Sequence, residues 1–140
     1  MYQSIDRLIH MTRVSRKPLR QEISNKILDN FHMMIVGLKS KKDTEDIFND
    51  FLSKAEKIVF AKRLAIAIML ESGMDYRTIS QEIKVSTGTV REVSNKLDKP
   101  RFRAFIRKLT RQSKTSNDMS WLKAALNAKT DMKARGRLYK

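Results

Sequence analysis

The sequence contains no cysteine and very little glycine or proline. Its 140 residues include four Gly and two Pro. Without cysteine the chain can form neither a disulfide nor a thiolate metal site. A chain with so few helix breakers and with plentiful Ala, Leu, Ile, Lys and Arg can be helical over most of its length. The composition therefore predicts an all-α fold.

Long apolar runs are also missing. The longest unbroken run, from Leu64 to Leu70, is far too short to span a bilayer. Residues 1–17 lack the continuous apolar stretch and the cleavage site of an export signal. We therefore expect no membrane partner and no export.

Groups arranged for catalysis or metal binding are not found in the sequence. His10 and His32 are far apart and have no supporting groups, so an exposed or hydrogen-bonded histidine is the expected state of each. We find no phosphate loop, no nucleophile paired with a base and no metal-binding motif. The sequence predicts no enzyme activity, no metal and no cofactor.

Acidic residues are scarce relative to basic ones. The chain has 30 Lys and Arg against 15 Asp and Glu, a net charge of +15. The excess is concentrated beyond residue 97, where thirteen basic residues accompany three acidic ones. A polyanion partner is the natural interpretation, because neutralised phosphates release counterions and supply affinity that does not depend on base sequence. The alternative is a soluble basic protein without such a partner.

The segment from Gly73 to Leu97 has the pattern of two short helices joined by a tight turn. Asp75 and Ser86 are start signals, because their side chains can accept hydrogen bonds from the free N–H groups of a first helical turn. Lys84 occupies the turn position where glycine is common, which costs about 1 kcal/mol if the backbone there is left-handed. The apolar positions of a helix-turn-helix are all filled, by Ile79, Ile83, Val85, Val90 and Val93. The pattern matches a helix-turn-helix that reads double-stranded DNA, and an ordinary helical hairpin is the alternative.

In such a motif the N-terminal residues of the second helix meet the bases. Arg91 can bond guanine bidentately, and Gly88 allows the backbone to approach DNA closely. Basic residues around the motif and just beyond it suit phosphates, although any one of them could be a solvated surface charge. The residues expected to contact DNA are Arg77, Lys84, Ser86, Thr87, Gly88, Thr89, Arg91, Asn95, Lys96, Arg101 and Arg103.

Helices are also predicted on both sides of this motif. A long amphipathic helix starts with Pro18 in its first turn and ends near Gly37, and after a polar link a short helix covers 44–52. Ser53 and Glu56 have the spacing of a capping box and open a helix that ends at Gly73. That helix is apolar almost all round, so its own chain or a second copy must surround it.

The basic segment after Leu97 restarts with a proline and is expected to carry a helical apolar stripe. The stripe comprises Phe102, Phe105, Ile106 and Leu109, and a further helical piece contains Trp121. The predicted organisation is a basic N-terminal arm or short helix over 1–17, a helical domain over 18–97 with the helix-turn-helix at 75–97, and a basic helical extension with a tail over 98–140.

The span from about Phe51 to Leu97 resembles the Trp repressor and its broader superfamily of small helical regulators. The resemblance is carried by FLSKAEKIVFAKRLAIAIMLESGMDYRTISQEIKVSTGTVREVSNKL, with a capped arginine-containing helix, a glycine, and the Tyr-Arg-x-Ile and Ser-Thr-Gly-Thr-Val segments. It implies a Trp-repressor-like fold and an intertwined homodimer whose central helices pack across the two-fold axis.

The resemblance also implies a site for tryptophan, held between two arginines with help from a hydroxyl residue and a glycine. Ser53, Arg63 and Thr89 stand at matching positions and form a possible effector pocket. Glu92 replaces the second arginine and Val93 the glycine. A glutamate repels a carboxylate, and a valine side chain fills space that the ring needs. We therefore expect no tryptophan co-repressor.

The favoured function is a sequence-specific DNA-binding transcriptional regulator, most simply a repressor, which reads the major groove with the helix 86–97. Its expected partners are double-stranded DNA and a second copy of the chain, and its expected place is the cytoplasm, on the nucleoid. Two alternatives stay open: an architectural, nucleoid-type DNA binder dominated by the basic C-terminal segment, and an accessory DNA-binding subunit of a transposase or recombinase.

Overall fold

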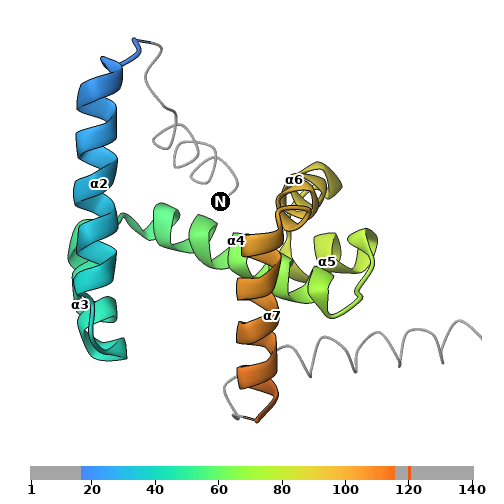
Figure 1. Cartoon of the computed structure of the whole chain (residues 1–140). Coiled ribbons are helices and arrows are strands. Elements are labelled where there is room, and N and C mark those ends of the chain that lie inside the picture. The colour runs from blue at the N-terminus through green and yellow to red at the C-terminus, as the bar shows by residue number, and fades with distance from the viewer. Residues whose placement is uncertain (1–16, 116–119, 121–140) are drawn as a thin grey trace, which may run out of the picture. The chain divides into compact units, whose positions relative to one another are not determined.

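The computed structural model describes residues 17–115 and residue 120. Residues 1–16 of the predicted arm, the piece containing Trp121 and the C-terminal tail lie outside the described residues. Within them every regular element is a helix, as the composition predicts (Figure 1). The helices are α2 (Gln21–Gly37), α3 (Lys41–Phe51), α4 (Lys54–Glu71), α5 (Tyr76–Ile83), α6 (Thr87–Leu97) and α7 (Pro100–Thr115).

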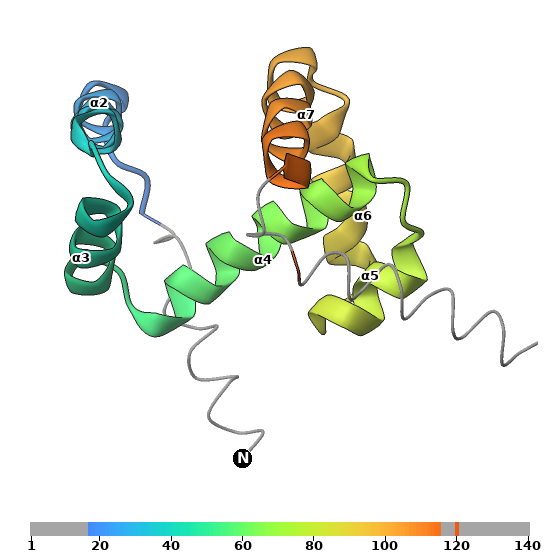
Figure 2. The ribbon, with the colours of Figure 1, turned by 90° about the horizontal axis from the view of Figure 1, so that it is seen from below.

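The first two helices of the described part of the chain, α2 and α3, follow each other with a short connection (Figure 2). Helix α2 begins at Gln21 rather than at Pro18, and its N-cap residue, Arg20, makes no side-chain cap. Helix α3 begins three residues earlier than the sequence predicts, because Ser40 caps it by accepting a hydrogen bond from the N–H of Asp43 at 3.1 Å. The predicted polar link is therefore mostly the first turn of α3.

Helix α4 opens with the predicted capping box. The N–H of Ser53 donates to Oε2 of Glu56 at 2.8 Å, and the N–H of Glu56 donates to Oγ of Ser53 at 3.3 Å. The hydroxyl of Ser53 also donates to Oε2 of Glu56 at 2.7 Å. This side-chain hydrogen bond, followed by the one from the N–H of Ser53, stabilises the charged carboxylate and lowers the pKa of Glu56. At the other end, Gly73 has a φ of 84°, the left-handed conformation that ends helices and that glycine adopts without strain. Both helix boundaries are confirmed.

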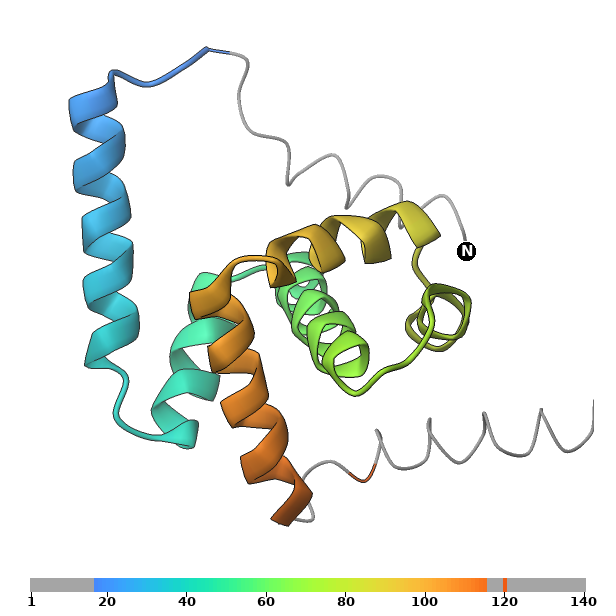
Figure 3. The same cartoon turned by 45° about the vertical axis from the view of Figure 1, so that its right-hand side comes forward.

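The hydrophobic core gathers around the C-terminal half of α4. Helices α5, α6 and α7 lie around this half (Figure 1, Figure 3). Burying one large aliphatic side chain completely is worth about 1.5–3 kcal/mol. The largest fully buried side chains are Ile66, Met69, Ile79, Val90 and Ile106, which come from all four helices. This part of the chain therefore has a core of its own.

The N-terminal part of the chain has no such core. The chain divides into two compact units between Val59 and Phe60, and none of the described residues up to Val59 is buried. In α4 the apolar side chains of Ile58, Phe60 and Leu64 are 45%, 53% and 42% exposed. The prediction that α4 is surrounded thus holds for its C-terminal half, and the rest of its apolar surface is open in a single chain.

Helix α7 is part of the core of the second unit. Ile106 and Thr110 are buried, and the hydroxyl of Thr110 donates to the carbonyl oxygen of Ile106 at 2.8 Å. Phe102 and Leu109 are half-buried against the same core. Phe105 was predicted to share this stripe but is 56% exposed, because one residue turns a helical side chain by about 100° away from its neighbour.

Candidate nucleic-acid interface

The two helices of the motif start at the predicted caps. Oδ1 of Asp75 accepts the N–H of Thr78 at 2.9 Å and so starts α5. Oγ of Ser86 accepts the N–H of Thr89 at 3.1 Å and starts α6. The Ser86 and Thr89 hydroxyls also lie 3.0 Å apart. The N-terminal end of α6 is therefore fixed by side chains of α6 and its cap.

The turn between these helices is built around Lys84 and Val85. Lys84 has a φ of 57°, so the backbone is left-handed at the turn position where glycine is common. Its side chain is exposed, whereas Val85 is half-buried against the core. The hydroxyl of Ser80 donates to the carbonyl oxygen of Val85 at 2.5 Å. This bond explains why a small polar residue stands where α5 approaches the turn.

Most of the side chains expected to contact DNA lie on the surface. Around the start of α6, Ser86, Thr87, Gly88 and Arg91 are exposed, and Thr89 is half-buried. A Cβ added to Gly88 would meet only Oγ of Ser86, at 3.6 Å, so the isolated protein has room for a larger residue there. Of the other residues expected to contact DNA, those with exposed side chains include Arg77, Lys84, Asn95, Lys96 and Arg101.

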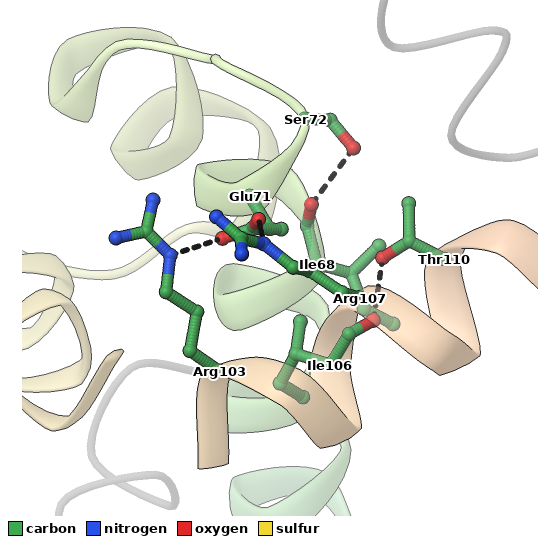
Figure 4. A network of polar contacts seen from close by, with 7 residues as sticks. All are labelled: Ile68, Glu71, Ser72, Arg103, Ile106, Arg107 and Thr110. Carbon is green, nitrogen blue, oxygen red and sulfur yellow. Dashed lines mark hydrogen bonds and ion pairs between the residues drawn. The ribbon is translucent and has the colours of Figure 1, made fainter. Parts of the chain in front are cut away.

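Arg103 was also expected at phosphates, but it takes part in an ion-pair network within the protein (Figure 4). Its Nε donates to Oε2 of Glu71 at 3.1 Å, and Nε of Arg107 donates to Oε1 of the same carboxylate. The hydrogen bond from Arg107, followed by the hydrogen bond and charge of Arg103, lowers the pKa of Glu71 against the opposing effect of burial. The network attaches α7 to the end of α4.

Sequence reasoning missed this network, because Glu71 is separated from Arg103 by 32 residues and from Arg107 by 36. No local spacing pairs such residues. Arg101, which precedes them on α7, is exposed. Of the two α7 arginines named from the sequence, only Arg101 is therefore outside the Glu71 network.

A pocket of about 180 Å³ lies beside α6. It is lined by Arg63 and Thr89, two of the three residues expected in an effector pocket. Glu92 and Val93, which replace the arginine and the glycine of the Trp repressor pattern, line it as well. Ser53 belongs to the first unit, where it caps α4. The remaining lining residues are Leu64, Lys96 and Phe102. Lys96, which the sequence assigned to phosphates, thus adds a second cation to the pocket wall.

Residues 26–112 match the family model described as Trp repressor protein. The chain belongs to the Trp repressor protein family. The match covers well over half of the chain and takes in most of α2, the helix-turn-helix and most of α7. The Trp repressor family consists of DNA-binding helix-turn-helix regulators and not of enzymes. No curated protein and no solved structure matches the chain.

In the described part of this Trp repressor family member, no helix is long and apolar enough to cross a membrane. Over the same residues, no group of three or more His, Asp or Glu side chains could hold a metal ion.

Proposed function

We propose that this protein is a sequence-specific transcriptional regulator that inserts the N-terminal end of α6 into the major groove and acts as a repressor in the cytoplasm, on the nucleoid. One observation carries the proposal. Thr87, Gly88 and Arg91 are exposed at the capped start of α6, while Val90 and Val93 of the same helix are buried. A helix anchored on one face and open at its N-terminal end has the docking geometry of a recognition helix.

Phosphate contacts would come from exposed cations around this helix. Arg77 precedes the turn, Lys84 is in the turn, and Lys96 and Arg101 follow the reading residues. Each phosphate neutralised on duplex DNA contributes about 0.9 to the slope of log affinity against log salt. We expect Arg103 to contribute little to this slope, since its guanidinium is already paired with Glu71.

The protein is proposed to act as a homodimer. Apolar side chains that no part of the described chain covers are found on α2, α3 and the first half of α4, for example Ile27, Phe51 and Phe60 at 52%, 59% and 53% exposure. Helices α2 and α3 bury no residue, and a hollow of about 500 Å³ lies along them. An apolar surface of this kind on a small protein is typical of an association face.

Selection of bound sites from a pool of random duplexes tests the regulator. We expect one preferred motif with two-fold symmetry, because a symmetric dimer places two recognition helices on related half-sites. Arg91→Ala should lower the preference for that motif over a scrambled duplex. Arg77→Ala should lower the affinity for both duplexes equally. Equal binding of all duplexes by the intact protein would contradict the proposal.

Sedimentation at several concentrations tests the dimer. Phe60→Asp places a charge on the open apolar surface of α4 and should give a monomer at concentrations where the natural chain is dimeric. Gln81→Asp, at an exposed position of α5, adds the same charge elsewhere and should leave the dimer intact. A natural chain that stays monomeric throughout would rule out this part of the proposal.

The charge distribution favours one second candidate, an architectural DNA binder dominated by the C-terminal segment. Thirteen of the thirty basic residues lie beyond residue 97. Truncation after Leu97 would remove the buried Ile106 and damage the core, so the chain should instead be shortened after Thr115. This truncation removes six of those thirteen basic residues. A regulator should keep its sequence preference, whereas an architectural binder should lose a large part of its affinity for every duplex.

A further inference from the structure

Helix α4 carries one lysine among its apolar residues whose role the helix itself does not explain. Lys62 is half-buried, and its Nζ donates to the carbonyl oxygen of Lys84 at 3.2 Å. Lys84 is the left-handed residue of the helix-turn-helix turn. The ammonium of α4 is therefore bonded to the backbone of the turn, 22 residues further along the chain.

The next carbonyl in the turn is bonded as well. The hydroxyl of Ser80 in α5 donates to the carbonyl oxygen of Val85. Two successive carbonyls, those of Lys84 and Val85, thus accept hydrogen bonds from side chains of two different helices. The residue that follows is Ser86, the N-cap of α6. The direction in which α6 leaves the turn is therefore set by bonds that come from both α4 and α5.

We propose that Lys62 is a positioning residue for DNA reading, which holds the turn so that the N-terminal end of α6 is presented in one orientation. The inference rests on the proposed regulator function and adds to it a residue outside the helix-turn-helix. Arg63, the next residue, turns by about 100° around the helix and lines the pocket beside α6. Lys62 alone of these two cations is bonded to the turn.

The chemistry of lysine suits this role. A hydrogen bond from an ionised donor is about twice as strong as one between neutral groups. The carbonyl of a left-handed residue lies outside the helical hydrogen-bond pattern, so a side chain or water must satisfy it. A side chain bonded to this carbonyl restricts the turn more than an exchanging water molecule does. This restriction is useful because recognition of bases requires the reading side chains to be positioned within a fraction of an ångström.

Three variants of the full chain test the inference. Lys62→Met keeps the length of the side chain and removes the donor, and Lys62→Arg keeps a charged donor. Lys54→Met removes the same charge from an exposed position in the first turn of α4. The measurements are affinity for the selected duplex and a scrambled duplex over a range of salt concentrations, and amide hydrogen exchange at residues 85–89.

For Lys62→Met we expect the ratio of specific to non-specific affinity to fall about tenfold, as loss of one charge-assisted hydrogen bond allows. Non-specific affinity and the salt slope should stay unchanged, and exchange should quicken at residues 85–89 only. Lys62→Arg should restore most of the ratio, and Lys54→Met should behave like the natural chain.

Several results would overturn the inference. A salt slope lowered by about one, with equal losses on both duplexes, would make Lys62 a phosphate contact. Faster exchange throughout α4 to α7 with an unchanged affinity ratio would make it a general stabilising residue. If the natural chain itself has no sequence preference, the regulator proposal fails, and unchanged exchange at residues 85–89 in Lys62→Met would then refute the positioning role separately.

Discussion

The carboxylate of Glu71, at the end of α4, accepts the Nε–H of Arg103 in α7 at 3.1 Å. Arg107 donates to the other oxygen of the same carboxylate. Since Glu71 is only 11% exposed, whereas the two arginines are about half exposed, the carboxylate depends on these partners for its solvation. The ion pairs thereby attach the basic helix α7 to α4, within the unit that also contains the proposed recognition helix α6.

Glu71→Gln should destabilise the protein at neutral pH. We expect a loss of about 1–2 kcal/mol in the free energy of unfolding, below the full worth of charged hydrogen bonds because the arginines are half exposed. The folded-state pKa of Glu71 is lowered, so its stabilisation is present above the unfolded-state pKa and is lost as the pH falls through the folded value.

Urea unfolding at pH 7 and at about pH 3 measures this dependence. The difference between the natural chain and Glu71→Gln should be clear at pH 7 and should shrink at the acidic end. Glu22→Gln removes the carboxylate of the exposed pair with Lys26 and should change little at either pH. An equal difference at both pH values would contradict a role for the charge of Glu71.

Replacing Lys84 should separate folding from DNA binding. Lys84→Gly removes the strain of a left-handed side-chain residue and should raise the free energy of unfolding by about 1 kcal/mol. The same change removes a cation from the proposed phosphate surface and should lower the salt slope by about one.

Lys84→Ala is the matched control, because it loses the cation but keeps a Cβ at a φ of 57°. Thermal unfolding and salt titrations of DNA binding measure both effects. We expect equal weakening of DNA binding in the two variants and higher stability in Lys84→Gly alone. Unchanged DNA binding in both would remove Lys84 from the interface.

Gly88→Ala should be tolerated by the fold and not by DNA binding. Alanine is a better helix former than glycine by up to about 1 kcal/mol, and the added Cβ meets only Oγ of Ser86 at ordinary contact distance. In a complex with DNA, the same methyl group would lie between the backbone of α6 and the major groove and would prevent their close approach.

Unfolding measurements should therefore show equal or higher stability for Gly88→Ala, together with a large loss of affinity for the selected duplex. Gln81→Ala also places an alanine at an exposed helical position, outside the residues expected to contact DNA, and should leave DNA affinity unchanged. Full DNA affinity in Gly88→Ala would show that the backbone of α6 does not approach DNA closely at this point.

L-Tryptophan should not stabilise the natural chain. The pocket beside α6 holds about 180 Å³, less than the roughly 300–1,000 Å³ of ordinary ligand sites. Val93 lines it and is only 4% exposed, and Glu92 places a carboxylate at its wall. A bound ligand raises the melting temperature by mass action.

Melting curves with and without about 1 mM tryptophan, a concentration that detects even weak ligands, check this prediction. The double variant Glu92→Arg, Val93→Gly enlarges the pocket and supplies the missing cation. It should be less stable than the natural chain but should gain stability when tryptophan is added. A shift in the natural chain would show that Glu92 and Val93 do not exclude the ligand.

The sequence predicts the parts of this structure that depend on neighbouring residues. The caps at Asp75 and Ser86, the capping box of Ser53 and Glu56, and the helix end at Gly73 all follow from spacings of a few residues. The Ser40 cap was missed, although Ser40 and Asp43 have the same short spacing as Ser86 and Thr89.

Contacts between distant segments could not be predicted in this way. Nothing near Glu71 indicates that Arg103 and Arg107 share it, and nothing near Lys62 indicates a bond to the turn. The apolar stripe of α7 was predicted too wide, since Phe105 lies beside Ile106 in sequence but points elsewhere. These features depend on how helices pack, which a spacing of a few residues does not record.

Helices α2 and α3 contain no buried residues, so little within a single chain stabilises them. Isolated helices of fewer than about 12–15 residues are marginal in water, and α3 has 11 residues. If a second copy covers their apolar faces, the order of this half depends on protein concentration. An unpaired chain would expose α2 and α3 to proteases, so cellular turnover would remove single chains faster than assembled ones.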